Sequence, residues 1–258
     1  MSIHPTALVD PRANLTDEAE IGPYAVVEPD VEIGEGTVIG AHVVLKSGLR
    51  LGKNVVVHEG AVLGGPPQDT KFQGSRSHAV VEDDVVIREF VTIHRSAHED
   101  GRTRVGRGVY IMAYGHVAHD CDIGDGAIIA SYAAVAGHIE VGAKAFVSGG
   151  VAIHQFTRVG ELSMIGGGSK VNLDVPPFMT VDGVPARAVG LNSIELRRAG
   201  VPEGEIRALK HAYRVLFREK RALDDALGVL GHIESDLVGR LAAFIRRSER
   251  GICRPRTR

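Results

Sequence analysis

Histidines and a carboxylate are concentrated in one short stretch of the chain, which runs YGHVAHDCDIG from Tyr114 to Gly124. His116 and His119 stand three residues apart, and Asp120 follows His119 directly. A neutral imidazole is a suitable general base near pH 7, so the stretch predicts base catalysis. Neighbours in a straight strand face opposite sides, so Asp120 either orients His119 at a bend or is only a corner residue.

A repeat that runs through most of the chain must position these groups. Counting in sixes from Ile3 to Val171, 26 of 29 positions are aliphatic. A six-residue period fits neither an amphipathic helix nor an ordinary strand, and it indicates a solenoid of short strands and turns. Three six-residue faces close one 18-residue coil of a triangular prism. Successive coils then stack as parallel strands about 4.8 Å apart.

The coil length brings two further histidines to the same place. Residues 18 apart lie on the same edge of the prism, so His138 falls one coil from His119 and His154 falls about two coils away. The spacing predicts that these three and His116 gather on one edge within roughly 10–15 Å. A single histidine is more often structural or merely exposed, but four on one edge indicate a functional site.

A covalent mechanism is not favoured. The sequence offers no serine or cysteine nucleophile with an evident partner, and Cys121 falls in an inward-pointing slot, where we interpret it as a packing residue. Direct attack by a substrate hydroxyl, with a histidine removing its proton, fits better.

Composition limits the class of protein. The 258 residues include 32 glycines, no tryptophan and 5% aromatics, which suits a core of small aliphatic side chains. A net charge of −2 gives no general attraction to nucleic acid. The N-terminus lacks a signal-peptide layout, and no apolar stretch approaches the roughly 18 residues of a membrane span. Cys121 and Cys253 make no disulfide framework, so we expect a cytoplasmic protein with free thiols.

Two excursions interrupt the repeat. Residues 63–80 lose the pattern and are interpreted as a loop that leaves the prism wall, and Glu99 marks a shorter excursion. Loops on a rigid scaffold often carry function. Polar side chains at Gln68, Asp69 and Lys71 favour such a role for the first loop over a neutral insertion.

The repeat ends at Asp174–Phe178, DVPPF, because proline cannot donate to a strand ladder. We expect residues 178–191 to be irregular. Apolar residues at helical spacing then predict a helix with Pro202 in its first turn. Two more helices are expected near 222–232 and 235–248.

Eight features of the sequence point to one family: the hexapeptide array and the motifs GGPPQDTKF, VTIHR, HVAHDC, VAGHIE, AIHQF, DVPPF and LRRAG. Together they resemble the UDP-N-acetylglucosamine O-acyltransferases that begin lipid A synthesis in Gram-negative bacteria, over essentially the whole chain. The resemblance implies a mainly β fold, a left-handed parallel β-helix followed by α-helices, which is an exception to right-handed crossover. We therefore expect a β-helix acyltransferase domain over 1–190, with the loop 63–80, and a helical domain over 191–258.

The family's reaction is the activity that the resemblance implies. It moves an (R)-3-hydroxyacyl group from acyl carrier protein to the 3-hydroxyl of UDP-N-acetylglucosamine, without a metal or other cofactor. The resemblance also implies a homotrimer with active sites between neighbouring prisms, and no role for nucleic acid or an integral membrane segment. Basic residues of the helical region are candidates to receive the acidic carrier protein: Arg197, Arg207, Arg214 and Arg218.

Catalytic roles can be carried over motif by motif. His119 matches the general base, Asp120 its polarising neighbour, and the amide of Gly137 the oxyanion donor. His116 and His138 match residues near the nucleotide sugar and the thioester.

The resemblance implies a wider set of substrate contacts. They are Gln68, Asp69, Lys71 and Phe72 in a loop reaching an adjacent subunit, His94 as a further substrate contact, His154 and Gln155 along the sugar and acyl site, and Asn192 and Arg198 at the nucleotide. Gly167 matches the position that limits acyl length, where glycine permits about 14 carbons. Ile194 stands where some members have glutamate, and Glu195 is one residue late, which leaves that contact open.

Three other classes of function would use some of the same sequence features. A related hexapeptide acyltransferase could act on a 3-amino or other nucleotide sugar, and the N-acyltransferases of the same pathway carry an extra N-terminal domain, whereas hexapeptides here begin at Ile3. A zinc enzyme resembling β-helix carbonic anhydrases needs three converging ligands, but His116 and His119 would face opposite sides of a strand. A non-catalytic scaffold would have no use for the histidine edge.

Overall fold

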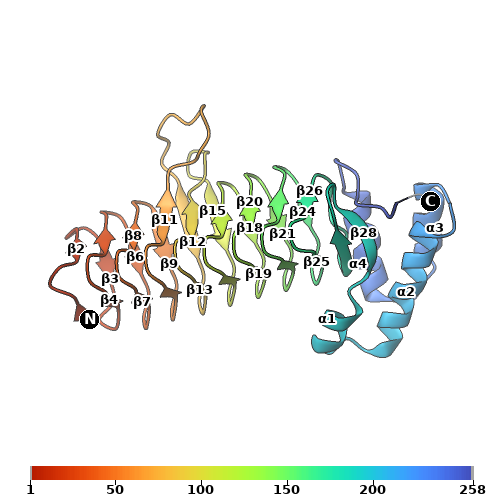
Figure 1. Cartoon of the computed structure of the whole chain (residues 1–258), viewed down its shortest axis with the longest axis horizontal. Coiled ribbons are helices and arrows are strands. Elements are labelled where there is room, and N and C mark those ends of the chain that lie inside the picture. The colour runs from red at the N-terminus through yellow and green to blue at the C-terminus, as the bar shows by residue number, and fades with distance from the viewer. Residues whose placement is uncertain (1, 257–258) are drawn as a thin grey trace.

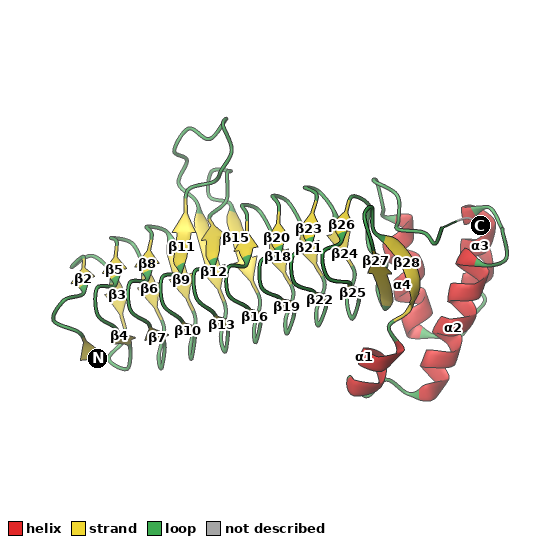
Figure 2. Ribbon diagram, viewed as in Figure 1, coloured by secondary structure: helices red, strands yellow, loops and turns green. Residues whose placement is uncertain are grey.

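The computed structural model describes residues 2–256, which form a long prism of short strands that ends against a group of helices (Figure 1). Three parallel sheets make the walls of the prism (Figure 2). From β1 to β26 successive strands along the chain belong to different sheets, so each coil contributes one strand to each wall. This is the left-handed parallel β-helix that we expected.

The three sheets are named A, B and C. Sheet A contains β1 (Ser2–Ile3), β4 (Glu20–Ile21), β7 (Val38–Ile39), β10 (Val56–Val57), β13 (Val86–Ile87), β16 (Tyr110–Ile111), β19 (Ile128–Ile129), β22 (Phe146–Val147), β25 (Met164–Ile165), β27 (Met179–Asp182) and β28 (Arg187–Leu191). Sheet B contains β2 (Leu8–Val9), β5 (Val26–Val27), β8 (Val44–Leu45), β11 (Val62–Gly65), β14 (Thr92–His94), β17 (His116–Val117), β20 (Ala134–Val135), β23 (Ala152–Ile153) and β26 (Lys170–Val171). Sheet C contains β3 (Asn14–Leu15), β6 (Glu32–Ile33), β9 (Leu49–Leu51), β12 (His78–Val81), β15 (Arg102–Val105), β18 (Asp122–Ile123), β21 (Glu140–Val141) and β24 (Arg158–Val159).

The six-residue period places one aliphatic side chain of each strand inside the prism. Ile21 of β4 is aligned with Ile39 of β7, one 18-residue coil along. Ile39, Leu45 and Ile129 are almost fully buried in a single core that runs along the prism. The alternation of strand side chains then turns the preceding residue of each strand outward.

The first excursion is shorter than the sequence suggested, and the second covers residues 95–101, between β14 and β15. β11 continues to Gly65 and β12 begins at His78, so the first loop covers residues 66–77 and not 63–80. The residues at the two ends of the predicted loop still pair with neighbouring strands of the prism walls, although their side chains do not follow the six-residue pattern. Val57 of β10 is aligned with Ile87 of β13, so this coil has 12 residues more than the usual 18. Thr92 of β14 is aligned with His116 of β17, which makes the next coil six residues longer.

The chain after the prism differs from expectation in two respects. Residues 178–191 are not irregular, because β27 and β28 form an antiparallel pair that extends sheet A. Within the described residues four helices follow: α1 (Ser193–Arg198), α2 (Glu203–Phe217), α3 (Leu223–Leu230) and α4 (Asp236–Arg246). Pro202 is the residue before α2 and not within its first turn. None of these four helices is both long and apolar enough to cross a bilayer.

Candidate active site

His119 and Asp120 occupy the corner between β17 and β18, where the chain passes from sheet B to sheet C. Asp120 has a φ of +60°, which breaks the alternation of a straight strand. The two side chains therefore meet, with Nδ1 of His119 2.8 Å from Oδ2 of Asp120. Because a carboxylate only accepts, Nδ1 carries the proton and Nε2 is left as the basic nitrogen.

The carboxylate of Asp120 is held by groups from the second excursion. Its Oδ1 accepts a hydrogen bond from the hydroxyl of Ser96, and its Oδ2 accepts one from the backbone N–H of Ala97 at 3.2 Å. Burial alone would raise the pKa of Asp120, but the hydrogen bonds from Ser96, His119 and Ala97 lower it below its usual range. The side chain is thus kept ionised beside the imidazole.

Gly137 and His138 come from the next coil and lie on the other side of His119. A Cβ atom at Gly137 would be 2.8 Å from Nε2 of His119, so only glycine lets the backbone approach the imidazole this closely. The rings of His138 and His119 meet edge to face at 5.0 Å, and Nε2 of His138 is 3.9 Å from Oδ2 of Asp120. Burial lowers the pKa of His138, and the charge of Asp120 opposes that shift.

His116 and His94 form a second pair on sheet B. Their rings meet edge to face at 4.9 Å, and Nδ1 of His116 is 2.7 Å from the hydroxyl oxygen of Thr92. Burial lowers the pKa of His116 and lowers that of His94 to about 4. Both rings are therefore neutral at pH 7, as substrate-binding donors or acceptors should be.

His154 is less closely tied to this group than the spacing argument suggested. The residue one coil above His138 is Phe156, and the two rings stack at 4.5 Å. His154 comes before that corner, is exposed, and contacts Gln155 O and Arg250 through its Nδ1. The roles of His154 and of Gln155, which is also exposed, stay predictions.

The first loop lies near the histidines. Asp69 raises the pKa of His138 by its charge, against the larger effect of burial. The carboxylate of Asp69 accepts from the N–H of Lys71 at 2.9 Å, and the ring of Phe72 lies under the guanidinium of Arg95. Gln68 and Lys71 are exposed, so their side chains are available to a substrate or a neighbouring subunit.

The three glycines at 166–168 have different surroundings. A Cβ at Gly166 would collide with the side chain of Asp182, and Gly168 has a φ of +66°. Gly167 has neither constraint, because a Cβ there would lie at an ordinary 3.6 Å from Gly149 O. The chain itself therefore leaves room for a side chain at 167.

The two predicted nucleotide contacts lie at α1. Asn192 is buried, caps the helix by accepting from Glu195 N at 3.5 Å, and donates to Leu162 O at 3.0 Å. Arg198 is exposed and lies 3.6 Å from the carboxylate of Glu195, while Ile194 points into solvent. Their contacts with a nucleotide stay predictions.

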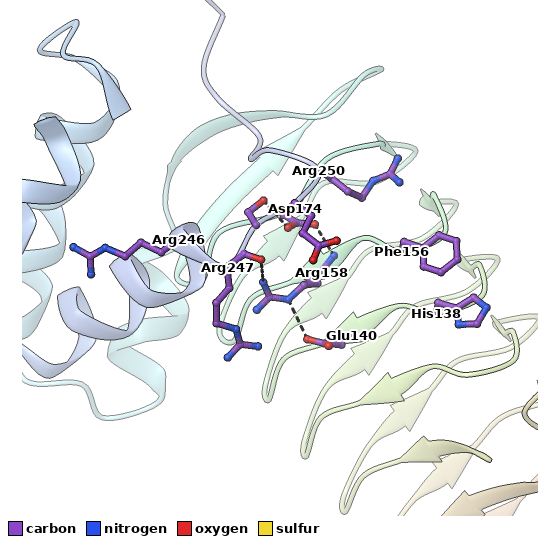
Figure 3. Close-up of a pocket in the computed structure, with 10 residues that line it drawn as sticks. His138, Glu140, Phe156, Arg158, Asp174, Arg246, Arg247 and Arg250 are labelled. Atoms are coloured by element: carbon purple, nitrogen blue, oxygen red, sulfur yellow. Dashed lines mark hydrogen bonds and ion pairs between the residues drawn. The ribbon is translucent and has the colours of Figure 1, made fainter. Parts of the chain in front are cut away.

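We call the edge of the prism that holds His119, Asp120 and His138 the histidine corner. A cavity of about 910 Å³ opens beside it, between the prism and the segment after α4. His138 and Phe156 line one side of it, and residues after α4, among them Arg247 and Arg250, line the other, whereas the side chain of Arg246 is directed toward the helices (Figure 3). Arg158 at its floor is fixed by Glu140 at 3.1 Å and by the carbonyl of Arg247. The lining offers arginines to an anionic group of a substrate, but it also contains the carboxylates Glu140, Asp174 and Glu249.

Metal binding is not what this corner suits best. His98, Asp120 and His138 each offer a ligand atom within 4.8 Å of the others. The Asp120 carboxylate, however, already accepts three hydrogen bonds, and a zinc site needs its ligand lone pairs free. The donors fit a hydrogen-bonded general base.

Cys121 is confirmed as a packing residue. It is 1% exposed, its Sγ lies 3.0 Å from Ala136 O, and burial raises the pKa of the thiol to about 12. It is therefore not a nucleophile at neutral pH.

Sequence reasoning missed three residues of the site. Phe156 could have been found, since it lies 18 residues after His138. Thr92 and Ser96 could not be found from an 18-residue coil, because the second excursion separates them from their partners His116 and Asp120 by 24 residues.

Comparison with known proteins agrees with the motifs. Residues 174–253 match the family model described as UDP-N-acetylglucosamine O-acyltransferase, domain 2, and residues 14–47, 30–65 and 102–137 match that of bacterial transferase hexapeptides. The acyl-[acyl-carrier-protein]–UDP-N-acetylglucosamine O-acyltransferase of Aquifex aeolicus is 57% identical over 98% of both chains. That of Halorhodospira halophila is 45% identical over 98% of this chain and 99% of the relative.

Solved structures give the same result. The UDP-N-acetylglucosamine acyltransferase of Bacteroides fragilis superposes with a TM-score of 0.95, at 38% identity, over 98% of this chain and 100% of the other. The Arabidopsis UDP-N-acetylglucosamine acyltransferase gives 0.84 at 32% identity, over 97% and 99%. The chain therefore belongs to the UDP-N-acetylglucosamine O-acyltransferase family.

Proposed function

We propose that this protein is an acyltransferase that moves an (R)-3-hydroxyacyl group from acyl carrier protein to the 3-hydroxyl of UDP-N-acetylglucosamine, the first step of lipid A synthesis. The observation that carries the proposal is the pairing of His119 with Asp120 at the prism corner. It leaves Nε2 of His119 as a base close to Gly137, where a Cβ atom would be 2.8 Å from that nitrogen.

The reaction then needs no covalent enzyme intermediate. Nε2 of His119 removes the proton of the sugar 3-hydroxyl as its oxygen attacks the thioester carbonyl. The amide of Gly137 is the proposed donor to the developing oxyanion. When the tetrahedral intermediate collapses, the carbon–sulfur bond breaks, and the leaving thiolate takes the proton from His119. The products are the ester and the free carrier thiol.

The arginine-lined cavity supports a substrate with phosphate groups. Arg158, Arg247 and Arg250 line it beside His138. UDP-N-acetylglucosamine carries a diphosphate, and the carrier's prosthetic group carries a phosphodiester, so either suits this lining. A nucleotide sugar with a 3-amino group would meet the same phosphate contacts, so the acceptor must be tested directly.

We further propose a homotrimer. The outward side chains of sheet A are apolar over six successive coils: Val56, Val86, Tyr110, Ile128, Phe146 and Met164. Those of sheet B are small or apolar over much of its length, whereas sheet C carries ion pairs such as Arg104–Asp122 and Arg158–Glu140. Two apolar walls and one charged wall are what a prism needs when sheet A of each subunit faces sheet B of the next.

Two further proposals concern location and domains. Free buried thiols at Cys121 and Cys253 support a cytoplasmic location. We also propose a division into a β-helix domain, 1–190, and a helical domain, 191–258. Phe178 and Met179 of the first domain pack in the core of the second.

Mass spectrometry of the product tests the reaction. The purified protein is incubated with UDP-N-acetylglucosamine and a panel of 3-hydroxyacyl carrier proteins, with the 3-amino sugar nucleotide as a second acceptor. We expect O-acylated product, and loss of activity by about 10²–10⁴-fold in His119→Ala with an unchanged fold. Full activity in that variant would exclude His119 as the base. Product formed only from the amino sugar nucleotide would mean that the acceptor carries a 3-amino group and not a 3-hydroxyl.

Light scattering tests the trimer with a matched pair of variants. Ile128→Glu places a charge on sheet A, and Asn14→Glu places the same charge on the outward face of sheet C. We expect the first variant to dissociate and lose activity, while the second stays assembled. An active monomer would contradict the assembly that we propose.

A further inference from the structure

The second excursion reaches the catalytic corner through one buried serine. Ser96 lies just after β14, is fully buried, and donates its hydroxyl hydrogen to Oδ1 of Asp120. We propose that Ser96 is a positioning residue, which holds the carboxylate of Asp120 in the orientation that directs His119. This inference rests on the proposed function of His119 as the base.

The hydroxyl of Ser96 has one orientation that satisfies its surroundings. Its oxygen accepts the backbone N–H of His98 at 3.0 Å, so its hydrogen is directed to Asp120. Both of its hydrogen-bonding functions are thus used inside the protein, as a buried hydroxyl requires. A rotated hydroxyl would leave the carboxylate with one donor fewer and the serine hydrogen unpaired.

Ser96 itself is held on several sides. Its carbonyl accepts the hydroxyl of Ser77 at 2.5 Å, and its N–H donates to the carbonyl of His78, both at the start of β12. Gly101 packs against it so closely that a Cβ there would collide with the serine side chain. A donor fixed in this way restricts the carboxylate more than a mobile side chain or a water molecule would.

Two donors of the excursion hold the carboxylate of Asp120, and a separate contact holds its backbone. Ser96 and the N–H of Ala97 approach it from the excursion, and the N–H of Asp120 is bound by the hydroxyl of Thr103 at 2.8 Å. Two carboxylate oxygens that are held separately cannot rotate away from Nδ1 of His119. Thr92 is aligned with His116, 24 residues along the chain, and the same offset places Ser96 beside Asp120.

Charged and titratable groups around the pair must be considered before any pH effect is predicted. The groups facing His119 and Asp120 are His138 from the next coil, His94 and His116 from sheet B, His98 from the excursion and, beyond His138, Asp69 from the first loop. Ser96→Ala leaves all of them in place. Loss of the serine donor concentrates negative charge on Asp120, which then attracts the imidazolium form of its neighbour more strongly.

The experiment compares Ser96→Ala with a chemically matched variant. Ser169 is also a buried serine, and its hydroxyl lies 3.1 Å from the carboxylate of Asp182 and accepts the N–H of Gly183. Ser169→Ala removes the same groups away from the catalytic corner. We expect kcat to fall about tenfold in Ser96→Ala, the usual effect of one hydrogen bond to a charged group. KM should stay within about twofold, because Ser96 does not touch the substrate.

The pH profile separates positioning from a structural role. In Ser96→Ala the acidic limb of the plot of kcat against pH should move to higher pH, whereas in Ser169→Ala it should not move. Ser96→Cys keeps a donor at this position, though a weaker one on a larger atom, and should fall between wild type and Ser96→Ala. This variant remains informative if the alanine variant does not fold. An unmoved acid limb in folded variants with normal kcat would overturn the proposal.

A double-mutant cycle decides whether Ser96 acts through Asp120. Asp120→Asn is the suitable partner variant, because asparagine tolerates the positive φ of this corner. The further loss from Ser96→Ala should disappear in the Asp120→Asn background, and additive losses would contradict our inference. If His119→Ala is fully active, the proposed base itself is wrong. If His119→Ala is inactive while Ser96→Ala is normal, only the role of Ser96 is wrong.

Discussion

The backbone of Gly137 packs against the edge of the His119 ring, so that a Cβ at position 137 would be 2.8 Å from Nε2 and 2.7 Å from Cε1. Real carbon contacts are not this short, so any side chain at 137 must displace the imidazole. The same approach brings a backbone segment of the next coil close to the basic nitrogen.

Gly137→Ala should therefore inactivate the enzyme without unfolding it. A displacement of the base by about 1 Å can reduce kcat about 10²-fold. Steady-state kinetics and circular dichroism check this together, with Gly190→Ala as the control because no atom lies within 4 Å of a Cβ there. Normal turnover in Gly137→Ala would mean that the corner adjusts without loss.

Gly167→Met should shift the acyl preference to shorter donors. The wild-type protein leaves space at this position, and each buried methylene contributes about 0.8 kcal/mol, so a longer groove prefers a longer chain. Forcing a long chain past methionine should cost roughly 1–3 kcal/mol. The measurement is the ratio of kcat/KM for long and short 3-hydroxyacyl donors. An unchanged ratio would leave Gly167 with no part in chain-length selection.

Binding of the acyl carrier protein should weaken steeply with salt. Arg207 and Arg214 are exposed on one face of α2, seven residues apart, and Arg218 is the exposed C-cap residue that follows the helix. Arg214 lies 3.6 Å from Glu219, and Arg197 pairs with Glu203 at 2.7 Å. Replacing Arg207 and Arg218 together by alanine should raise KM for the carrier and flatten its dependence on ionic strength.

The double variant of Arg207 and Arg218 has a simple control. KM for UDP-N-acetylglucosamine should change little with the same substitutions, because α2 is not among the elements that line the histidine corner. A KM for the carrier that does not vary with salt in the wild-type protein would argue against an electrostatic docking surface.

Acid should destabilise the folded protein through His94. Burial lowers the pKa of His94 from 6.5 to about 4, so between these values the unfolded chain binds a proton that the folded chain does not. The free energy of unfolding is therefore unaffected above about pH 6.5 and decreases as pH falls toward 4. The decrease for this one group is at most about 3 kcal/mol.

Chemical denaturation at pH 7.5 and 4.5 checks this effect. His94→Asn should reduce the difference between the two free energies, whereas His4→Asn, at an exposed position near the N-terminus, should leave it unchanged. Equal pH dependence in His94→Asn and wild type would show that His94 is not protonated differently in the two states.

Much of the fold could be predicted from the sequence because the repeat is local. An aliphatic residue every six positions needs only its neighbours one coil away to be buried, as the alignment of Ile21 with Ile39 shows. The predicted positions of the interruptions were also right, since they coincide with the two longer coils. The pair β27–β28 was missed, because its strands lack the six-residue spacing and pair antiparallel.

The sequence by itself determined the prism, the edge where its histidines gather and the residue types of the proposed catalytic pair. Only the tertiary structure decided that His119 and Asp120 face each other, because this depends on the left-handed backbone at Asp120. It also decided that Ser96 meets Asp120, since a uniform 18-residue coil would have brought Arg102 to that level. Spacing predicts contacts as long as every coil has the same length, and an insertion changes which residues meet without disturbing the repeat.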